Sequence, residues 1–214
     1  MIQDPNIPEK LLDEILEDAV EKALNEGTDV ESMRFHGDAL PDLSGEIVEF
    51  IGCNFESCIF SDTGADRLVF VDCVFHKCDL SSMNFHKATF QRVSFSHCRM
   101  TGTQFSNGTV MNASFLDCQM DYANFSETKA QHISFVRCAM KESVFYRFNW
   151  QDWALEECNL RRAEFAHTPL KGMDVSTCDI EGIVTDIPNL RGLKVTAAQA
   201  MVLSGLLGLV IKGD

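Results

Sequence analysis

Apolar residues recur at every fifth position through most of this 214-residue sequence. From Phe35 to Leu190 these positions are apolar except at Gly45 and Thr185, and they hold fifteen of the sixteen phenylalanines. An α-helix repeats after about 3.6 residues and a strand after two, so neither has this period. With 45% hydrophobic residues, chance would leave more than half of the positions polar. The chain is therefore predicted to fold as a repeat structure with a five-residue unit.

A second set of small or apolar residues lies two positions before each central residue. All nine cysteines belong to it, and seven follow one another at intervals of twenty: Cys58, Cys78, Cys98, Cys118, Cys138, Cys158 and Cys178. Residues i and i−2 lie on the same face of an extended backbone, because side chains alternate along a strand. Each pentapeptide is therefore predicted to be one short strand and one turn, and four of them close a coil of twenty residues.

The segments CDLSSMNF, CRMTGTQF, CQMDYANF and CNLRRAEF show this pattern clearly. In them the chain resembles the pentapeptide-repeat family, over about three quarters of its length. The resemblance implies an all-β solenoid, a right-handed quadrilateral β-helix with four pentapeptides per coil and about eight coils. Stacked strands lie about 4.8 Å apart, so the rod is expected to be roughly 38 Å long.

The limits of the repeat divide the chain into three predicted segments. Residues 1–33 form an acidic N-terminal helical cap with ten acids and two bases, residues 34–190 the repeat β-helix, and residues 191–214 a C-terminal dimerisation segment. Pro8 and Gly27 are predicted to mark the first turn and the end of the N-terminal helix. Its apolar stripe is expected to cover the first coil, with partner binding as the alternative: Leu11, Leu12, Ile15, Leu16, Ala19, Val20, Ala23 and Leu24.

The C-terminal segment leaves the repeat after Leu190. Thr196 and Gln199 have the spacing of a capping box, which predicts a short helix. The apolar stretch LLGLVI follows and is too short to span a membrane. An apolar end of this kind is expected to be buried in a two-fold homodimer interface, with a helix and a strand contributing. The predicted interface residues are Leu203, Leu206, Leu207, Leu209 and Val210.

The inward positions have alternative interpretations. In-register thiols fit the torsion of a disulfide poorly, and a line of single thiols does not converge on a metal ion. We therefore interpret the cysteine column as buried, reduced and hydrophobic. Phe148 and Trp150 stand twenty residues after Thr128 and Ala130. We interpret these large residues as filling a dry core rather than lining a cofactor pocket.

Signals of catalysis are absent from the sequence. It contains no Walker loop, no glycine-rich dinucleotide turn and no metal-spaced histidine pair. We therefore expect no enzyme, no catalytic residue, no metal, no cofactor and no small-molecule substrate. Neither a long apolar run nor a basic leader before an apolar stretch occurs, which predicts a cytoplasmic protein without a membrane partner. A net charge of −14 also argues against direct nucleic-acid binding through a basic patch.

Within the family, the chain is most similar to the quinolone-resistance (Qnr-like) branch in its length and its C-terminal segment. That resemblance implies a C-terminal homodimer and a DNA-mimicking binder of a type II topoisomerase, DNA gyrase or topoisomerase IV, which inhibits the enzyme or modulates its response to inhibitors. Residues 117–186 hold twelve acids and seven bases, whereas residues 80–116 hold no acid. The predicted partner-binding residues are Asp117, Asp121, Glu142, Glu156, Glu157, Asp179 and Glu181.

Two alternatives to the topoisomerase hypothesis remain at this point. Outward residues of a solenoid are polar simply because they are solvated. The chain can equally be a structural or scaffolding rod that binds an unknown protein partner, since a fold does not by itself determine a function.

Overall fold

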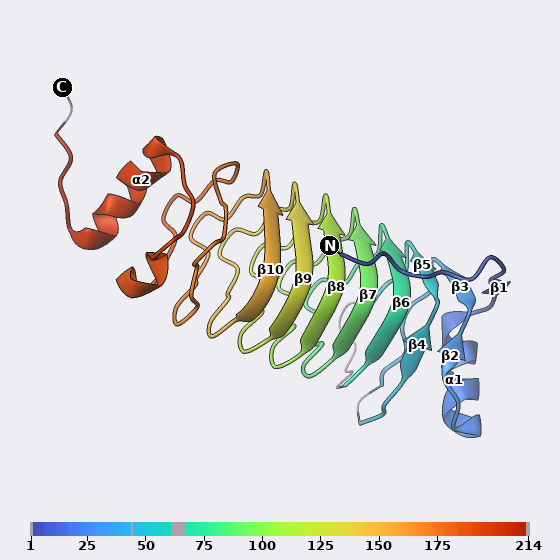
Figure 1. The fold of residues 1–214 in the computed structure, drawn as a ribbon. Helices are drawn as coiled ribbons and strands as arrows, with labels where there is room; N and C mark the ends of the chain where they lie inside the picture. Colours follow the sequence, from blue (N-terminus) through green and yellow to red (C-terminus); the bar gives the residue numbers. More distant parts are fainter. Residues whose placement is uncertain (1, 44, 61–66, 213–214) are drawn as a thin grey trace.

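The computed structural model describes residues 2–43, 45–60 and 67–212, and shows a parallel β-solenoid of about seven turns (Figure 1). This confirms the predicted all-β solenoid, although about eight coils are expected from the sequence. The strands are β1 (Leu12–Asp13), β2 (Val30–Glu31), β3 (Met33–His36), β4 (Glu49–Ile51), β5 (Asn54–Glu56), β6 (Val69–His76), β7 (Thr89–Ser96), β8 (Thr109–Leu116), β9 (Lys129–Val136) and β10 (Asn149–Glu156). The helices are α1 (Leu16–Glu26), α2 (Ala197–Ser204) and the 3-10 helices η1 (Ile187–Leu190) and η2 (Gly205–Leu207).

Consecutive coils are paired in parallel with a shift of twenty residues. Phe95 pairs with Phe75 on one side and with Phe115 on the other, so the central residues of β6, β7 and β8 are in register. Two further sides of the coil are joined by single bridges, such as Asp79 to Arg99. The period of five is thus one side of the coil, and the period of twenty is one turn.

Most corners of the coil contain a residue in the left-handed backbone conformation. Twenty-two of the described residues other than glycine have a positive φ, including Arg92 at 51°, Asp117 at 52° and Arg137 at 50°. This conformation costs an L-residue about 1–2 kcal/mol. The corner N–H groups are nevertheless bonded to the next coil, as the Asp117 N–H is to Val136 O (3.0 Å) and the Arg137 N–H to Glu156 O (2.8 Å). The ladder therefore continues through the corners and offsets their backbone strain.

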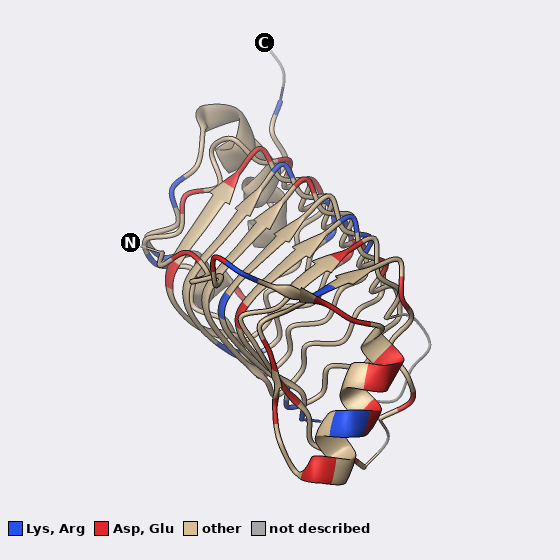
Figure 2. Cartoon of the chain, turned by 90° about the vertical axis from the view of Figure 1, so that its right-hand side faces the viewer, with Lys and Arg blue, Asp and Glu red and all other residues tan. Residues whose placement is uncertain are grey.

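Helix α1 covers the N-terminal end of the solenoid but is shorter than predicted (Figure 2). It begins at Leu16 rather than near Pro8, and it ends as expected at Gly27, which has a φ of 65°. Its buried residues are Leu16, Ala19, Val20 and Ala23. The other members of the predicted stripe are not part of this contact, because Leu11 is half-buried and Leu12, Ile15 and Leu24 are exposed.

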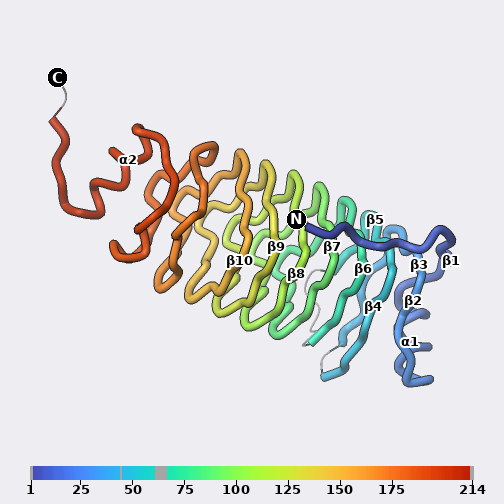
Figure 3. The backbone as a smooth tube through the Cα atoms, viewed as in Figure 1, coloured from blue at the N-terminus to red at the C-terminus, as the bar shows by residue number. Residues whose placement is uncertain are grey.

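Residues 2–14 form an extended strap instead of a helical turn, and they run back across the strands as far as β8 (Figures 1 and 3). The Leu12 N–H donates to Ser32 O (3.0 Å) and the Glu14 N–H to Arg34 O (3.4 Å). A helix in this position would leave those carbonyl groups on an open strand edge. Tertiary pairing therefore outweighs the helical pattern of the segment.

Helix α2 follows the last coils at the C-terminal end of the solenoid (Figure 1). The Gln199 N–H donates to Thr196 Oγ1 (3.2 Å) and the Thr196 N–H to Gln199 Oε1 (2.8 Å), which confirms the predicted capping box. The Gln199 amide also donates to Val175 O (2.7 Å) and Cys178 O (2.8 Å). One side chain therefore begins the helix and attaches it to the last coils. Among the described residues, no helix has the length and apolarity that crossing a membrane requires.

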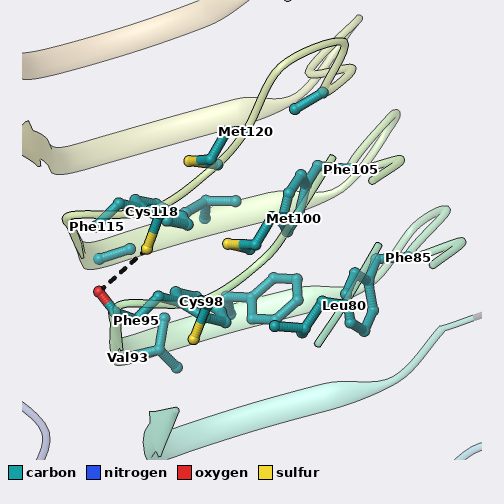
Figure 4. Close-up of a cluster of buried hydrophobic side chains, with 14 of the residues drawn as sticks. Leu80, Phe85, Val93, Phe95, Cys98, Met100, Phe105, Phe115, Cys118 and Met120 are labelled. Atoms are coloured by element: carbon teal, nitrogen blue, oxygen red, sulfur yellow. Dashed lines mark hydrogen bonds between the residues drawn. The ribbon is translucent and has the colours of Figure 1, made fainter. Parts of the chain in front are cut away.

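The interior consists of columns of like side chains (Figure 4). The ring centroids of Phe95 and Phe115 lie 4.9 Å apart with an interplanar angle of 6°, and those of Phe115 and Phe135 lie 4.6 Å apart at 9°. All three rings are buried. Since each ring is covered by the coils above and below it, no coil can bury its own core alone.

Replacement of a stacked ring tests this dependence. Phe115→Ala is expected to lower the free energy of unfolding by about 3–5 kcal/mol, because the neighbouring coils cannot collapse into the void. Leu116→Ala is the control, since Leu116 is the next residue and is 37% exposed; its effect is expected to stay within about 1 kcal/mol. Urea denaturation measures both. A loss below about 1 kcal/mol for Phe115→Ala contradicts the stacked core.

Asp72 provides a pH-dependent test of the strap and its corner. Two hydrogen bonds from Arg92, each 2.7 Å long, hold the pKa of the Asp72 carboxyl below its ordinary value. A lowered folded pKa means that the charged group stabilises the fold above the unfolded pKa of about 3.9, and that this contribution is lost as the pH falls through the folded pKa.

The measurement is the free energy of unfolding of the parent and of Asp72→Asn across pH. We expect the difference between them to be constant from about pH 5 to pH 7 and to shrink below about pH 4. Asp13→Asn, whose side chain is 78% exposed, controls for removal of a negative charge. A difference that persists unchanged to about pH 2 contradicts the assigned ion pair.

Candidate partner-binding face

The acids predicted to meet a partner lie on one side of the coil and on its two adjoining corners. We call these residues the acidic face: Asp117, Asp121, Glu142, Glu156, Glu157, Asp179 and Glu181. Glu156, Glu157, Asp179 and Glu181 are exposed, whereas Asp117, Asp121 and Glu142 are half-buried. Basic residues stand among the acids along the turns of the solenoid (Figure 2). The structure therefore brings the seven acids onto a common face, which is not uniformly negative.

Ion pairs between coils hold four of these acids. Arg137 donates from Nε and Nη2 to the two Asp117 carboxylate oxygens, both at 2.8 Å. This hydrogen bonding holds the pKa of Asp117 below its ordinary value. Arg161 Nη1 lies 3.3 Å from Asp179 Oδ2 and 2.5 Å from Glu181 Oε2. In addition, Arg162 Nη1 lies 3.6 Å from Glu142 Oε1.

The other three acids carry the remaining negative charge of the face. The Asp121 carboxylate accepts the backbone N–H of Lys141 at 2.8 Å, so it is held in place by the next coil. Within the described part of the chain, Glu156 and Glu157 make no ion pair, and both are exposed. These two adjacent carboxylates are the part of the acidic face that is most available to a basic partner.

The C-terminal segment presents apolar side chains to solvent. Leu207, Leu209 and Val210 are 55%, 59% and 89% exposed, while Leu203 and Leu206 are half-buried. Beside them is a hollow of about 200 Å³ lined by Leu190, Leu193, Val195, Ala200, Leu203, Ser204 and Leu207. Contiguous apolar surface of this kind marks an interaction site in a folded protein. The homodimer interface remains a prediction.

Comparison with known proteins agrees with the architecture. The sequence profile described as the pentapeptide repeat region matches residues 46–125 and 69–145. Residues 46–145 thus match the pentapeptide-repeat family, as the sequence pattern predicted. No curated protein matches it.

Solved structures of other pentapeptide-repeat proteins show limited similarity to this one. A trypsin-treated variant of QnrB1, a plasmid-mediated fluoroquinolone resistance protein, is 24% identical and has a TM-score of 0.38; the alignment covers 87% of this chain and 91% of that one. HetL, involved in heterocyst differentiation regulation in the cyanobacterium Nostoc sp. strain PCC 7120, is 11% identical with a TM-score of 0.24, over 82% and 92% of the two chains. Neither likeness supports a functional assignment.

The cysteines of this pentapeptide-repeat protein are buried and free, as predicted. The Cys118 thiol points at Phe95 O of the coil before, 3.7 Å away (Figure 4). Thr103 occupies the same place on another side of the coil and donates to Leu80 O at 2.7 Å. Burial raises the pKa of the Cys73 thiol well above its ordinary value. The cysteines are thus buried, weakly donating core residues. Among the described residues, no group of three or more His, Cys, Asp or Glu has a metal-binding arrangement.

Trp150 departs from the inward pattern, which the sequence did not predict. Phe148 and Trp153 are buried with ring centroids 4.9 Å apart, and they fill the interior of this coil. Trp150 is half-exposed, and its Nε1–H donates to Pro169 O at 2.8 Å. The dry-core interpretation is therefore confirmed for Phe148 and wrong for Trp150. The sequence does contain a signal for this departure, since three large aromatic residues stand within six positions. A close-packed coil cannot hold all three, so one of them has to point outward.

Proposed function

We propose that this protein is a non-enzymatic binder of a type II topoisomerase, DNA gyrase or topoisomerase IV. It acts as a DNA mimic that inhibits the enzyme or modulates its response to inhibitors. The observation that carries the proposal is the acidic face itself, in which carboxylates recur on one side of a stiff rod from coil to coil. The sequence resemblance to the Qnr-like branch gives the class of partner.

A DNA mimic has to hold its negative charges at fixed positions. A surface that binds duplex DNA is basic, and it gains affinity from phosphates in a regular array. In this solenoid the backbone ladder fixes every outward position, at steps of about 4.8 Å from coil to coil. The exposed pair Glu156 and Glu157 lies in one of the last paired strands and the corner after it, towards the C-terminal end.

A homodimer through the C-terminus completes the proposal. The exposed residues Leu207, Leu209 and Val210 would be covered by the same segment of a second copy, with Leu203 and Leu206 beneath them. Such an isologous contact places the acidic faces of two copies on either side of a two-fold axis. The resulting surface is twice as long as one rod.

The assembly is tested by sedimentation equilibrium at micromolar concentration. The full chain is expected to sediment at twice its mass of 24.0 kDa, and the double variant Leu207→Glu, Val210→Glu as a monomer, because buried carboxylates oppose the contact. Ile47→Glu is the control, since Ile47 is an exposed apolar residue near the other end. A monomeric parent contradicts the dimer and leaves the topoisomerase test unaffected.

The partner is tested in a supercoiling assay with purified gyrase. The parent is expected to inhibit supercoiling, and Glu156→Lys with Glu157→Lys to weaken the inhibition at least about tenfold, because close charge pairs across an interface are strongly coupled. Glu21→Lys with Glu26→Lys makes the same change in net charge on exposed residues of α1 and is expected to inhibit like the parent.

Ionic strength gives a second readout. Dissolved salt screens exposed charges such as the carboxylates of the acidic face. Inhibition by the parent is therefore expected to weaken steeply with added salt. A parent that never inhibits, or a Glu156/Glu157 double variant that inhibits as well as the parent, rules out the proposed DNA mimicry.

A scaffolding rod is the second candidate, and the ion pairs of the acidic face favour it. Residues 117–186 have twelve acids and seven bases, a net charge of −5 over three and a half coils. At about 4.8 Å per coil this is one net charge in roughly 3.4 Å, whereas duplex DNA has one in about 1.7 Å. The face thus has about half the charge density of the duplex. A face of this lower charge density also suits a partner that does not bind DNA.

A further inference from the structure

One column of corner residues is already a binding site for extended chain. We call it the track, with one residue in each coil: Ser32, Gly52, Asp72, Arg92, Asn112, His132 and Asp152. The strap lies along its first part. The Asn6 N–H donates to Asp72 Oδ1 (2.9 Å) and the Gln3 N–H to Asn112 Oδ1 (3.2 Å). Pro8 passes so close to Gly52 that a Cβ atom there would lie 2.9 Å from Pro8 Cδ.

The spacing of the strap matches the spacing of the track. Asp72 and Asn112 are two coils apart, about 9.6 Å. Gln3 and Asn6 are three residues apart, about 10 Å in an extended chain. An extended peptide therefore meets a side-chain oxygen of the track at every second coil, and it donates a backbone N–H to each.

Asp152 is the next acceptor in this series, forty residues after Asn112. It resembles Asp72 in having a basic neighbour one coil before or after it: Arg92 holds the Asp72 carboxylate, and His132 Nδ1 lies 2.8 Å from Asp152 Oδ2. Among the described residues, the strap crosses β8 and does not extend over β9 or β10 (Figure 1). The Asp152 side chain is 63% exposed, so its carboxylate is open to a further ligand.

A groove adjoins Asp152. One part has a volume of about 520 Å³ and includes Arg147, Trp150, Asp152 and Lys171; the neighbouring part, about 280 Å³, includes Met111, Lys129 and Trp150. Trp150 and Met111 give it an apolar floor. Three bases and one acid line the two parts together, although the chain as a whole has a net charge of −14. The groove is therefore a basic site on an acidic protein.

We propose that this groove binds an extended, acidic peptide segment of a protein partner, which continues the path of the strap along the track. A backbone N–H of the peptide donates to Asp152, an apolar side chain packs on Trp150, and carboxylates face Lys129 and Lys171. The site lies on the opposite side of the coil from the acidic face, so it is independent of topoisomerase binding. The strap supplies the mode of binding, and the bases supply the preference for acidic sequence.

The probe is a fluorescein-labelled peptide with the sequence of strap residues 2–9, Ile-Gln-Asp-Pro-Asn-Ile-Pro-Glu. Saturable binding to the full chain is measured by fluorescence anisotropy at protein concentrations up to about 1 mM. Asp152→Ala and Lys171→Glu are each expected to weaken binding at least about tenfold. Both side chains are exposed, and thermal melting verifies that the variants are folded. Lys87→Glu, an exposed lysine at another corner, is expected to bind like the parent.

Two further arms separate the groove from other sites. A neutral peptide with Asn for Asp and Gln for Glu is expected to bind at least about tenfold more weakly, because it lacks the carboxylates that face Lys129 and Lys171. Asp72→Asn is expected to leave binding unchanged, because Asp72 lies under the strap and outside the groove. Weaker binding by this variant means that the probe displaces the strap instead of occupying the groove, which contradicts the proposal. No binding up to about 1 mM, or equal binding by the parent and Asp152→Ala, overturns the proposal.

Discussion

The hydrogen-bonded stacking of one coil on the next is the interaction on which the rest of the structure depends. It pairs residues twenty apart through the strands and also through the left-handed corners, where the Asp117 N–H bonds to Val136 O. A single coil has no separate core, because the ring of Phe115 is covered by Phe95 and Phe135. Backbone register and ring stacking therefore require each other, and an insertion in one coil would displace both.

The same ladder determines what the surface can do. Outward side chains twenty residues apart are neighbours, so Arg137 meets Asp117 and Arg92 meets Asp72 without any further folding. Function on such a rod has to come from the sequence of outward residues along each column. The acidic face, which includes several such columns, and the track, which is one column, lie on opposite sides of the coil. The first presents carboxylates to solvent, and the second presents hydrogen-bond acceptors to the extended strap.

The coil around Trp150 shows what happens when interior volume conflicts with periodicity. Phe148 is buried at a position where the preceding coil holds Thr128, and Trp153 is buried beside it. Close packing leaves no room for a third large ring, so Trp150 moves outward and its indole finds Pro169 O. In this outward position Trp150 lines the groove beside the track.

The sequence alone predicted the solenoid, the inward columns, the buried cysteines and the capping box of α2, because each depends on residues at fixed, short spacings. It did not predict the strap, the later start of α1 at Leu16, the outward Trp150 or the ion pairs that partly neutralise the acidic face. These features depend on contacts between distant residues, such as Asn6 with Asp72. A periodic sequence determines which way a side chain points, whereas competition for volume and for hydrogen-bond partners is decided only when the coils are stacked.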